Sequence, residues 1–235
     1  MTKRKAQLIV ALDVDTLDEA KGLIDTLGDA VEIFKVGSQL FTACGPVIVR
    51  HLLKVGKKVF LDLKFHDIPN TVANAVTAAV GLNENGRSIF MCTLHMAGGR
   101  EMLERAVEAA TETSKRSGVK RPFLLGITVL TSEAQTDSIG SLVLEKAMLA
   151  KEAGLDGVVA SSHEAALIRE HLGGDLIIVT PGIRPAGVQA GDQKRVTTPA
   201  EAQAQGSDFL VVGRPIVKAK DPAQAVKQIL EEMAR

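Results

Sequence analysis

The chain has 235 residues, of which 46% are hydrophobic, and its 28 basic side chains balance its 28 acidic ones. Because no run of basic residues is longer than residues 3–5, the charge pattern argues against a surface for nucleic acid or anionic membranes. The apolar segment 8–12 is too short for a signal peptide, and no other run approaches the length of a membrane span. Two cysteines, Cys44 and Cys92, form neither a zinc motif nor a disulfide framework, so we expect a reduced, cytoplasmic protein.

Short apolar runs alternate with helical patterns along the whole chain. Strands are predicted at 8–12, 31–36, 59–63, 88–94, 121–127, 157–160, 176–180 and 209–212. Helices are predicted at 16–27, 46–54, 70–82, 100–115, 142–153, 162–171 and 222–233. Because the strand runs are apolar on both faces, we expect a parallel sheet that is covered by helices.

The number of strand–helix units and the chain length favour a closed (β/α)8 barrel, the TIM barrel, whose usual size is about 250 residues. We expect one such catalytic domain over residues 1–235. An open doubly wound sheet is the alternative, and it would require a glycine-rich turn after the first strand. Asp13, Val14 and Asp15 occupy that place, which favours the barrel.

The segment 60–71, FLDLKFHDIPNT, concentrates charge directly after an apolar strand. Since side chains alternate along a strand, Asp62 and Lys64 should project to the same side, and Asp67 follows within one short loop. Such a group is either a salt bridge that caps a strand or part of a catalytic array. His66 lies inside the motif and is interpreted as structural. The other histidines lack metal-ligand spacing, so no metal site is predicted.

Other predicted strands also end in polar residues. In a barrel of this type, the C-terminal ends of the strands build the site. Residues at or just beyond such ends are Asp13, Lys35, Asp62, Lys64, Thr131, Gly213 and Arg214. Each residue alone is consistent with an exposed loop position. Together they bring charged groups of alternating sign to one rim, which indicates a site.

The loops after the seventh and eighth strands predict an anion site. Their sequences, PGIRP and VGRPI, contain Arg184 and Arg214. Arginine matches phosphate oxygens with parallel hydrogen bonds, and glycine exposes backbone N–H groups. The long irregular stretch that follows Arg184 and includes Gln193 is typical of a lid or a binding loop. We therefore expect a ligand whose phosphate lies near the two arginines and whose reacting end lies near the charged motif.

The motifs LIVALDVD, FKVGSQLF, FLDLKFHDIPNT, TVLTS, TPGIRP and VVGRPI occur in this order, and together they resemble the orotidine 5′-phosphate decarboxylase family over essentially the whole chain. The short D-x-K-x-x-D is shared with sugar-phosphate decarboxylases of the same superfamily, whereas the longer motifs are strongly specific. The resemblance implies decarboxylation of orotidine 5′-monophosphate to UMP in pyrimidine nucleotide synthesis. It also implies that neither a metal nor an organic cofactor takes part.

The resemblance further implies roles for the matched positions. Lys64 would donate a proton to C6 of the pyrimidine, and Asp62 would lie beside the departing carboxylate. Lys35 and Asp13 would contact the ribose, and Thr131 would contact the pyrimidine. Gln193 and Arg184 would contact the closing loop and the phosphate. Gly213 and Arg214 would contact the phosphate. Asp67 and Thr71 would reach into the neighbouring subunit's site, so that the active form would be a homodimer.

Two alternatives remain open. A sugar-phosphate decarboxylase or aldolase-like barrel would act through a metal-held enediolate and would need Mg²⁺. A barrel that only senses a nucleotide phosphate would keep the arginine loops without needing Lys64.

Decarboxylation requires the Lys64 side chain to be charged. We expect Asp62 and Asp67 to favour the charged ammonium form, although burial opposes it.

Overall fold

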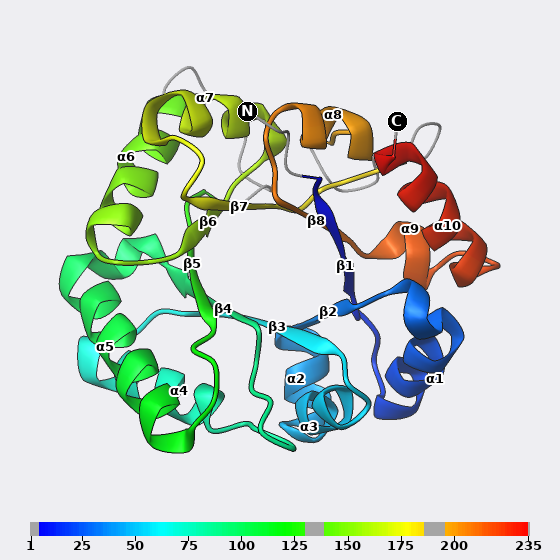
Figure 1. Cartoon of the computed structure of the whole chain (residues 1–235), viewed down its shortest axis with the longest axis horizontal. Helices are drawn as coiled ribbons and strands as arrows, with labels where there is room; N and C mark the ends of the chain where they lie inside the picture. The colour runs from blue at the N-terminus through cyan, green and yellow to red at the C-terminus, as the bar shows by residue number, and fades with distance from the viewer. Residues whose placement is uncertain (1–4, 130–138, 186–195, 235) are drawn as a thin grey trace.

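The computed structural model describes residues 5–129, 139–185 and 196–234, and within these ranges eight parallel strands close into a barrel in chain order (Figure 1). The strands are β1 (Gln7–Ala11), β2 (Ile33–Gly37), β3 (Lys58–Phe65), β4 (Met91–His95), β5 (Phe123–Ile127), β6 (Gly157–Val159), β7 (Ile177–Thr180) and β8 (Phe209–Val212). The ring closes between β1 and β8, where Ile9 pairs with Val211. The predicted TIM barrel is confirmed.

Helices surround the barrel on its outer side (Figure 1). They are α1 (Leu17–Leu27), α2 (Ser38–Cys44), α3 (Val47–Lys54), α4 (Pro69–Val80), α5 (Gly99–Ser117), α6 (Ile139–Glu152), α7 (Ser162–Leu172), α8 (Pro199–Ala204), α9 (Arg214–Val217) and α10 (Pro222–Met233), with the short turns η1 (Gly28–Ala30) and η2 (Met96–Gly98). The Thr16 side chain caps α1 by accepting a hydrogen bond from the backbone N–H of Glu19. Within the described ranges, no helix has the length and apolar character needed to cross a membrane.

Two apolar layers explain why the strands are hydrophobic on both faces. Alternate strand residues such as Ile9, Phe60 and Met91 pack together inside the barrel. The residues between them, such as Val10 and Leu61, belong to the layer that packs against the helices. All five are at most 2% exposed. The middle of the barrel is therefore a filled core, and polar groups gather at its ends.

Some predicted boundaries are wrong. Segment 88–90 precedes β4 instead of beginning it, and β3 runs on to Phe65 because its register against β4 shifts after Leu61. The sequence pattern also does not predict the short helices α2, α8 and α9, since helices of 4 to 7 residues show too little periodicity. For α8 a signal was available, because Thr198 and Glu201 form a capping box.

Candidate active site

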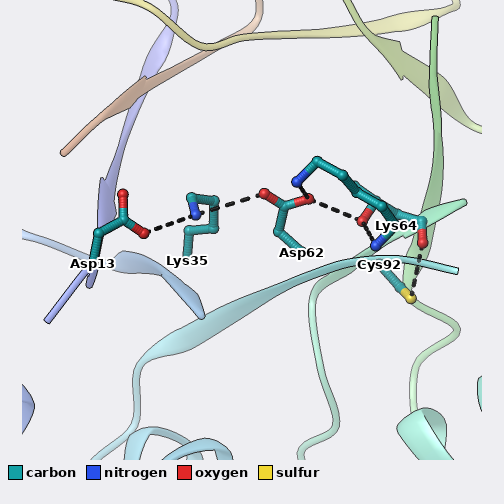
Figure 2. A network of polar contacts seen from close by, with 6 residues as sticks. Asp13, Lys35, Asp62, Lys64 and Cys92 are labelled. Carbon is teal, nitrogen blue, oxygen red and sulfur yellow. Dashed lines mark hydrogen bonds and ion pairs between the residues drawn. The ribbon is translucent and has the colours of Figure 1, made fainter. Parts of the chain in front are cut away.

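Four charged residues form a row across the C-terminal ends of β1 to β3 (Figure 2). Lys35 places its Nζ 3.2 Å from Oδ1 of Asp13 and 3.6 Å from Oδ2 of Asp62. The Nζ of Lys64 lies 2.9 Å from Oδ1 of Asp62. The sign of the charge thus alternates along the row. The prediction that Asp62 and Lys64 share one side of the strand is confirmed.

The middle of this row is more buried than its ends. The side chains of Asp62 and Lys35 are 11% and 13% exposed, whereas those of Lys64 and Asp13 are 38% and 44% exposed. Burial raises the pKa of the Asp62 carboxyl, but the charges of Lys35 and Lys64 and hydrogen bonds from Lys64 and Thr93 outweigh it, so that the pKa lies below its ordinary value. Asp62 is therefore a carboxylate at neutral pH, held between two ammonium groups.

Thr93 belongs to the site, although no sequence motif identifies it. It lies in β4 and is fully buried. Its hydroxyl lies 3.0 Å from Oδ1 of Asp62 and 2.9 Å from the backbone nitrogen of Lys64. A β-branched residue inside an apolar strand is ordinary in a sheet, so the sequence alone gives no reason to single it out.

A cavity of about 220 Å³ lies beside the charged row. Its apolar wall comes from Ala11, Phe60, Ile127, Val129, Val159 and Val211. The other described residues that line it are Asp13, Lys35, Asp62, Lys64, Pro181, Gly182, Arg184, Gly213 and Arg214. The cavity therefore joins the charged row to the two arginine-containing loops. These loops lie far from the charged row in the sequence.

Arg184 lies at the cavity wall just after β7 and is only 9% exposed. Its backbone N–H donates a hydrogen bond to the carbonyl of Thr197 at 3.0 Å. One guanidinium N–H donates to the carbonyl of Ile183, also at 3.0 Å. These bonds fix the backbone and one edge of the side chain beside the cavity.

Gly213 and Arg214 follow β8, and Arg214 begins α9 on an exposed part of the rim. A Cβ atom on Gly213 would lie 3.2 Å from Oδ2 of Asp13 and 3.5 Å from the Ala11 side chain. A larger residue would therefore crowd the end of the charged row. Glycine keeps this part of the cavity open between Asp13 and Arg214.

Other predicted site residues lie away from this cavity or outside the described part of the chain. Asp67 and Thr71 are exposed, and neither is among the described residues that line the cavity. The Oδ1 atom of Asp67 accepts a hydrogen bond from the backbone N–H of Ile68 at 2.6 Å. The predicted contacts of Thr131 and Gln193 fall on residues outside the described ranges.

The histidines next to the site are packed against each other. The rings of His66 and His95 stack with their centroids 5.1 Å apart and an interplanar angle of 17°. The Nδ1 atom of His95 also accepts a hydrogen bond from the backbone N–H of Ala97. The structural role expected for His66 stays a prediction. In the part of the chain that the structure describes, no three His, Cys, Asp or Glu side chains are grouped to hold a metal ion.

A (β/α)8 barrel with alternating charges at its C-terminal mouth, facing arginines after β7 and β8, has the architecture of an enzyme for a small anionic substrate. The sequence profile of the orotidine 5′-phosphate decarboxylase / HUMPS family matches residues 6–229. The chain belongs to this family.

Individual relatives agree with this assignment. The chain is 49% identical to orotidine 5′-phosphate decarboxylase of Geobacter sulfurreducens, over 99% of both chains. It is 48% identical to the Vibrio cholerae protein of the same name, over 95% of this chain and 96% of that one. Among solved structures, orotidine 5′-phosphate decarboxylase from Lactobacillus acidophilus superimposes with a TM-score of 0.82 at 37% identity, covering 98% of this chain and all of that one.

Proposed function

We propose that this protein decarboxylates orotidine 5′-monophosphate to UMP and CO₂ in pyrimidine nucleotide synthesis, with no metal or organic cofactor. The observation that carries the proposal is the Lys64–Asp62 ion pair, 2.9 Å between Nζ and Oδ1, inside the cavity that Arg184 and Arg214 also line. The family and the named relatives support this reaction.

The cavity suggests how the substrate would lie. Its phosphate would contact Arg214, Arg184 and the backbone at Gly213, because arginine and glycine-rich loops recognise phosphate oxygens. The ribose would contact the Lys35 and Asp13 end of the row. The pyrimidine would then reach Lys64 and Asp62, with C6 and its carboxylate directed at this pair. Thr131 and Gln193 are proposed as further contacts to the pyrimidine and to the closing loop.

The chemistry requires a positively charged group next to C6. Loss of CO₂ breaks the bond between C6 and the carboxylate and leaves the electron pair on C6, where the ring cannot delocalise it well. An ammonium group at Lys64 would stabilise that charge and then donate its proton to form the C6–H bond of UMP. A group already fixed by Asp62 does this without the reorganisation that water would need.

One lysine cannot account for the whole rate enhancement of an enzyme. Enzymes lower barriers by about 8–23 kcal/mol, whereas the loss of one electrostatic donor typically costs about 2.7–4 kcal/mol. We infer that binding of the distant phosphate supplies a further share of this effect. The resemblance implies that the segment 181–195, of which residues 186–195 lie outside the described ranges, closes over the substrate. Closure would press the substrate carboxylate against Asp62, a group that already carries negative charge.

We also propose a cytoplasmic homodimer with two shared sites. Asp67 and Thr71 are exposed on the loop after β3 and on α4, where a second copy of the chain could meet them. Next to them, Ile68 leaves 65% of its surface exposed, so an apolar side chain also lies where the second copy would pack. In the dimer, Asp67 of one subunit would extend the charged row of the other.

One spectrophotometric assay tests the reaction. The purified protein is mixed with orotidine 5′-monophosphate in EDTA, and the ultraviolet absorbance of the pyrimidine is followed. The chain has no Trp and no Tyr, so its own absorbance is low. We expect conversion to UMP that EDTA does not slow. Activity that requires added Mg²⁺ would favour the metal-held enediolate chemistry of the sugar-phosphate enzymes, and binding without conversion would favour a sensor.

A further inference from the structure

Thr93 connects the two central residues of the charged row. Its hydroxyl donates a hydrogen bond to Oδ1 of Asp62 at 3.0 Å and accepts one from the backbone N–H of Lys64 at 2.9 Å. A hydroxyl has a single proton, so using it on Asp62 leaves the lone pairs for the N–H of Lys64. Thr93 is fully buried, and water does not compete for either bond.

The backbone of Lys64 is unusual at the point that Thr93 contacts. Its φ angle is +51°, in the left-handed region that residues with a Cβ rarely adopt. The pairing of β3 with β4 shifts between Leu61 and Phe65, so the strand is irregular there. In place of a ladder carbonyl, the N–H of Lys64 uses the hydroxyl of Thr93. Such a conformation persists only where the surroundings hold it in place.

The same hydroxyl also fixes the carboxylate that Lys64 contacts. The Oδ1 atom of Asp62 receives both the Thr93 hydroxyl and the Lys64 ammonium, while Lys35 contacts Oδ2. Rotation of the carboxylate would break these contacts together. One side chain therefore contacts both the backbone turn at Lys64 and the carboxylate that pairs with the Lys64 ammonium group.

We propose that Thr93 is a positioning residue for the decarboxylation, holding Lys64 in its left-handed conformation and orienting Asp62 so that the ammonium group meets C6. This proposal rests on the proposed function and adds to it a residue that does not touch the substrate. Near-attack geometry is sensitive to displacements of about 1 Å, so loss of one hydroxyl here should reduce turnover more than binding.

The test compares Thr93→Val with Thr93→Ser. Valine keeps the shape of threonine without the hydroxyl, whereas serine keeps the hydroxyl without the methyl group. We expect Thr93→Val to lower kcat about 10- to 100-fold, with KM within about threefold, because hydrogen bonds to charged groups are strong and these act on the reacting geometry. Thr93→Ser should retain kcat within about threefold of the original chain.

A matched control separates positioning from general packing. Thr113 in α5 is also buried. Among the described residues, the Thr113 hydroxyl hydrogen-bonds only to the hydroxyl of Thr77, at 3.4 Å. Thr113→Val should leave kcat and KM unchanged. If circular dichroism shows that Thr93→Val does not fold, Thr93→Ala against Thr93→Ser makes the same comparison, since alanine and serine differ only by the hydroxyl.

The outcomes distinguish this proposal from the proposed function. An original chain that fails to convert orotidine 5′-monophosphate overturns the function itself. An active original chain with a fully active Thr93→Val, or with Thr93→Ser as impaired as Thr93→Val, overturns the role of the Thr93 hydroxyl. Amide hydrogen exchange at Lys64 gives a readout that needs no substrate, and it should accelerate in Thr93→Val, where the N–H has lost its acceptor.

Discussion

The ammonium group of Lys35 lies 3.6 Å from Oδ2 of Asp62, the carboxylate oxygen that Lys64 does not contact. Each oxygen of this buried carboxylate thus faces its own cation. The arrangement keeps Asp62 charged despite its burial, and it keeps both ammonium groups next to a fixed anion. A substrate carboxylate brought to the same place would meet a negative charge, while the carbanion left behind would meet a positive one.

The first prediction concerns stability at low pH. The pKa of Asp62 in the folded protein lies below its ordinary value of 3.8, so the folded state binds fewer protons there than the unfolded state. The resulting stabilisation is complete above the ordinary pKa and is lost as the pH falls through the lowered one. Asp62→Asn cannot titrate. In urea unfolding between about pH 5 and pH 3, the original chain should therefore lose free energy of unfolding faster than Asp62→Asn. Parallel pH curves for the two proteins would contradict the lowered pKa.

The second prediction concerns Lys64→Ala. Removing both the charge and the proton donor should lower kcat by at least about 1,000-fold, since each effect alone is typically worth about 100-fold or more. Binding of UMP, measured by calorimetry, should change by less than about tenfold, because the phosphate contacts are intact. Lys227→Ala on the exposed side of α10 is the matched control and should be fully active. Substantial residual turnover in Lys64→Ala would remove Lys64 from the role of proton donor.

The third prediction concerns the phosphate. If phosphate binding is used to reach the transition state, orotidine, which lacks the phosphate, should lose kcat as well as affinity. Arg214→Ala should likewise lower kcat/KM for the phosphorylated substrate by about 100-fold or more. With orotidine as substrate, the variant and the original chain should have nearly the same kcat/KM. Arg105→Ala, at an exposed pair with Glu108 on α5, is the control. A raised KM with unchanged kcat for orotidine would show that the phosphate only anchors the substrate.

The sequence predicts the barrel and much of the charged row for one physical reason. A strand buried on both faces leaves an apolar run, and a parallel barrel brings the ends of all such runs to one rim. Asp13, Lys35 and Asp62 are therefore identifiable as the polar residues at or near the ends of the first three runs. The structure joins them by ion pairs of 3.2 and 3.6 Å.

Other features depend on contacts that no local pattern encodes. The left-handed backbone of Lys64 and its bond to Thr93 arise from a shift in pairing between two strands, and a lysine inside an extended run gives no sign of it. The helix α2 is too short for a periodic signal. Contacts between subunits are likewise absent from a single chain, so the roles of Asp67 and Thr71 remain predictions.

The fourth prediction tests the shared site by mixing two inactive proteins. Lys64→Ala and Asp67→Asn should each be nearly inactive as homodimers. In a mixed dimer, the intact Lys64 of one subunit would meet the intact Asp67 of the other, restoring one site of the two. After dissociation and reassociation at equal amounts, the mixture should recover about a quarter of the original activity, because about half of the dimers are mixed and each of these has one working site of its two.

The control is a mixture of Lys64→Ala with the double variant Lys64→Ala,Asp67→Asn, which should recover no activity. Failure of the first mixture to recover, with mixed dimers demonstrated by mass spectrometry, would contradict a site shared through Asp67.

The fifth prediction uses a glycine that leaves room for the charged row. A Cβ atom on Gly37 would lie 2.9 Å from Nζ of Lys35 and 3.6 Å from Oδ1 of Asp13. The backbone of Gly37, at φ −92°, suits alanine, and the atom it would crowd most is the end of a flexible side chain. Gly37→Ala should therefore fold with an unchanged or slightly higher melting temperature, while the displaced ammonium group should lower kcat/KM about tenfold or more.

The control for this substitution is Gly22→Ala on α1, where a Cβ atom would meet nothing within 4 Å. It should stabilise the helix by about 1 kcal/mol and leave the activity unchanged. A crystal structure of Gly37→Ala should show the Lys35 ammonium moved away from Asp13. If Gly37→Ala instead keeps full activity with Lys35 displaced, the spacing between Lys35 and Asp13 has no part in catalysis. Catalysis would then depend only on Asp62 and Lys64 of the charged row.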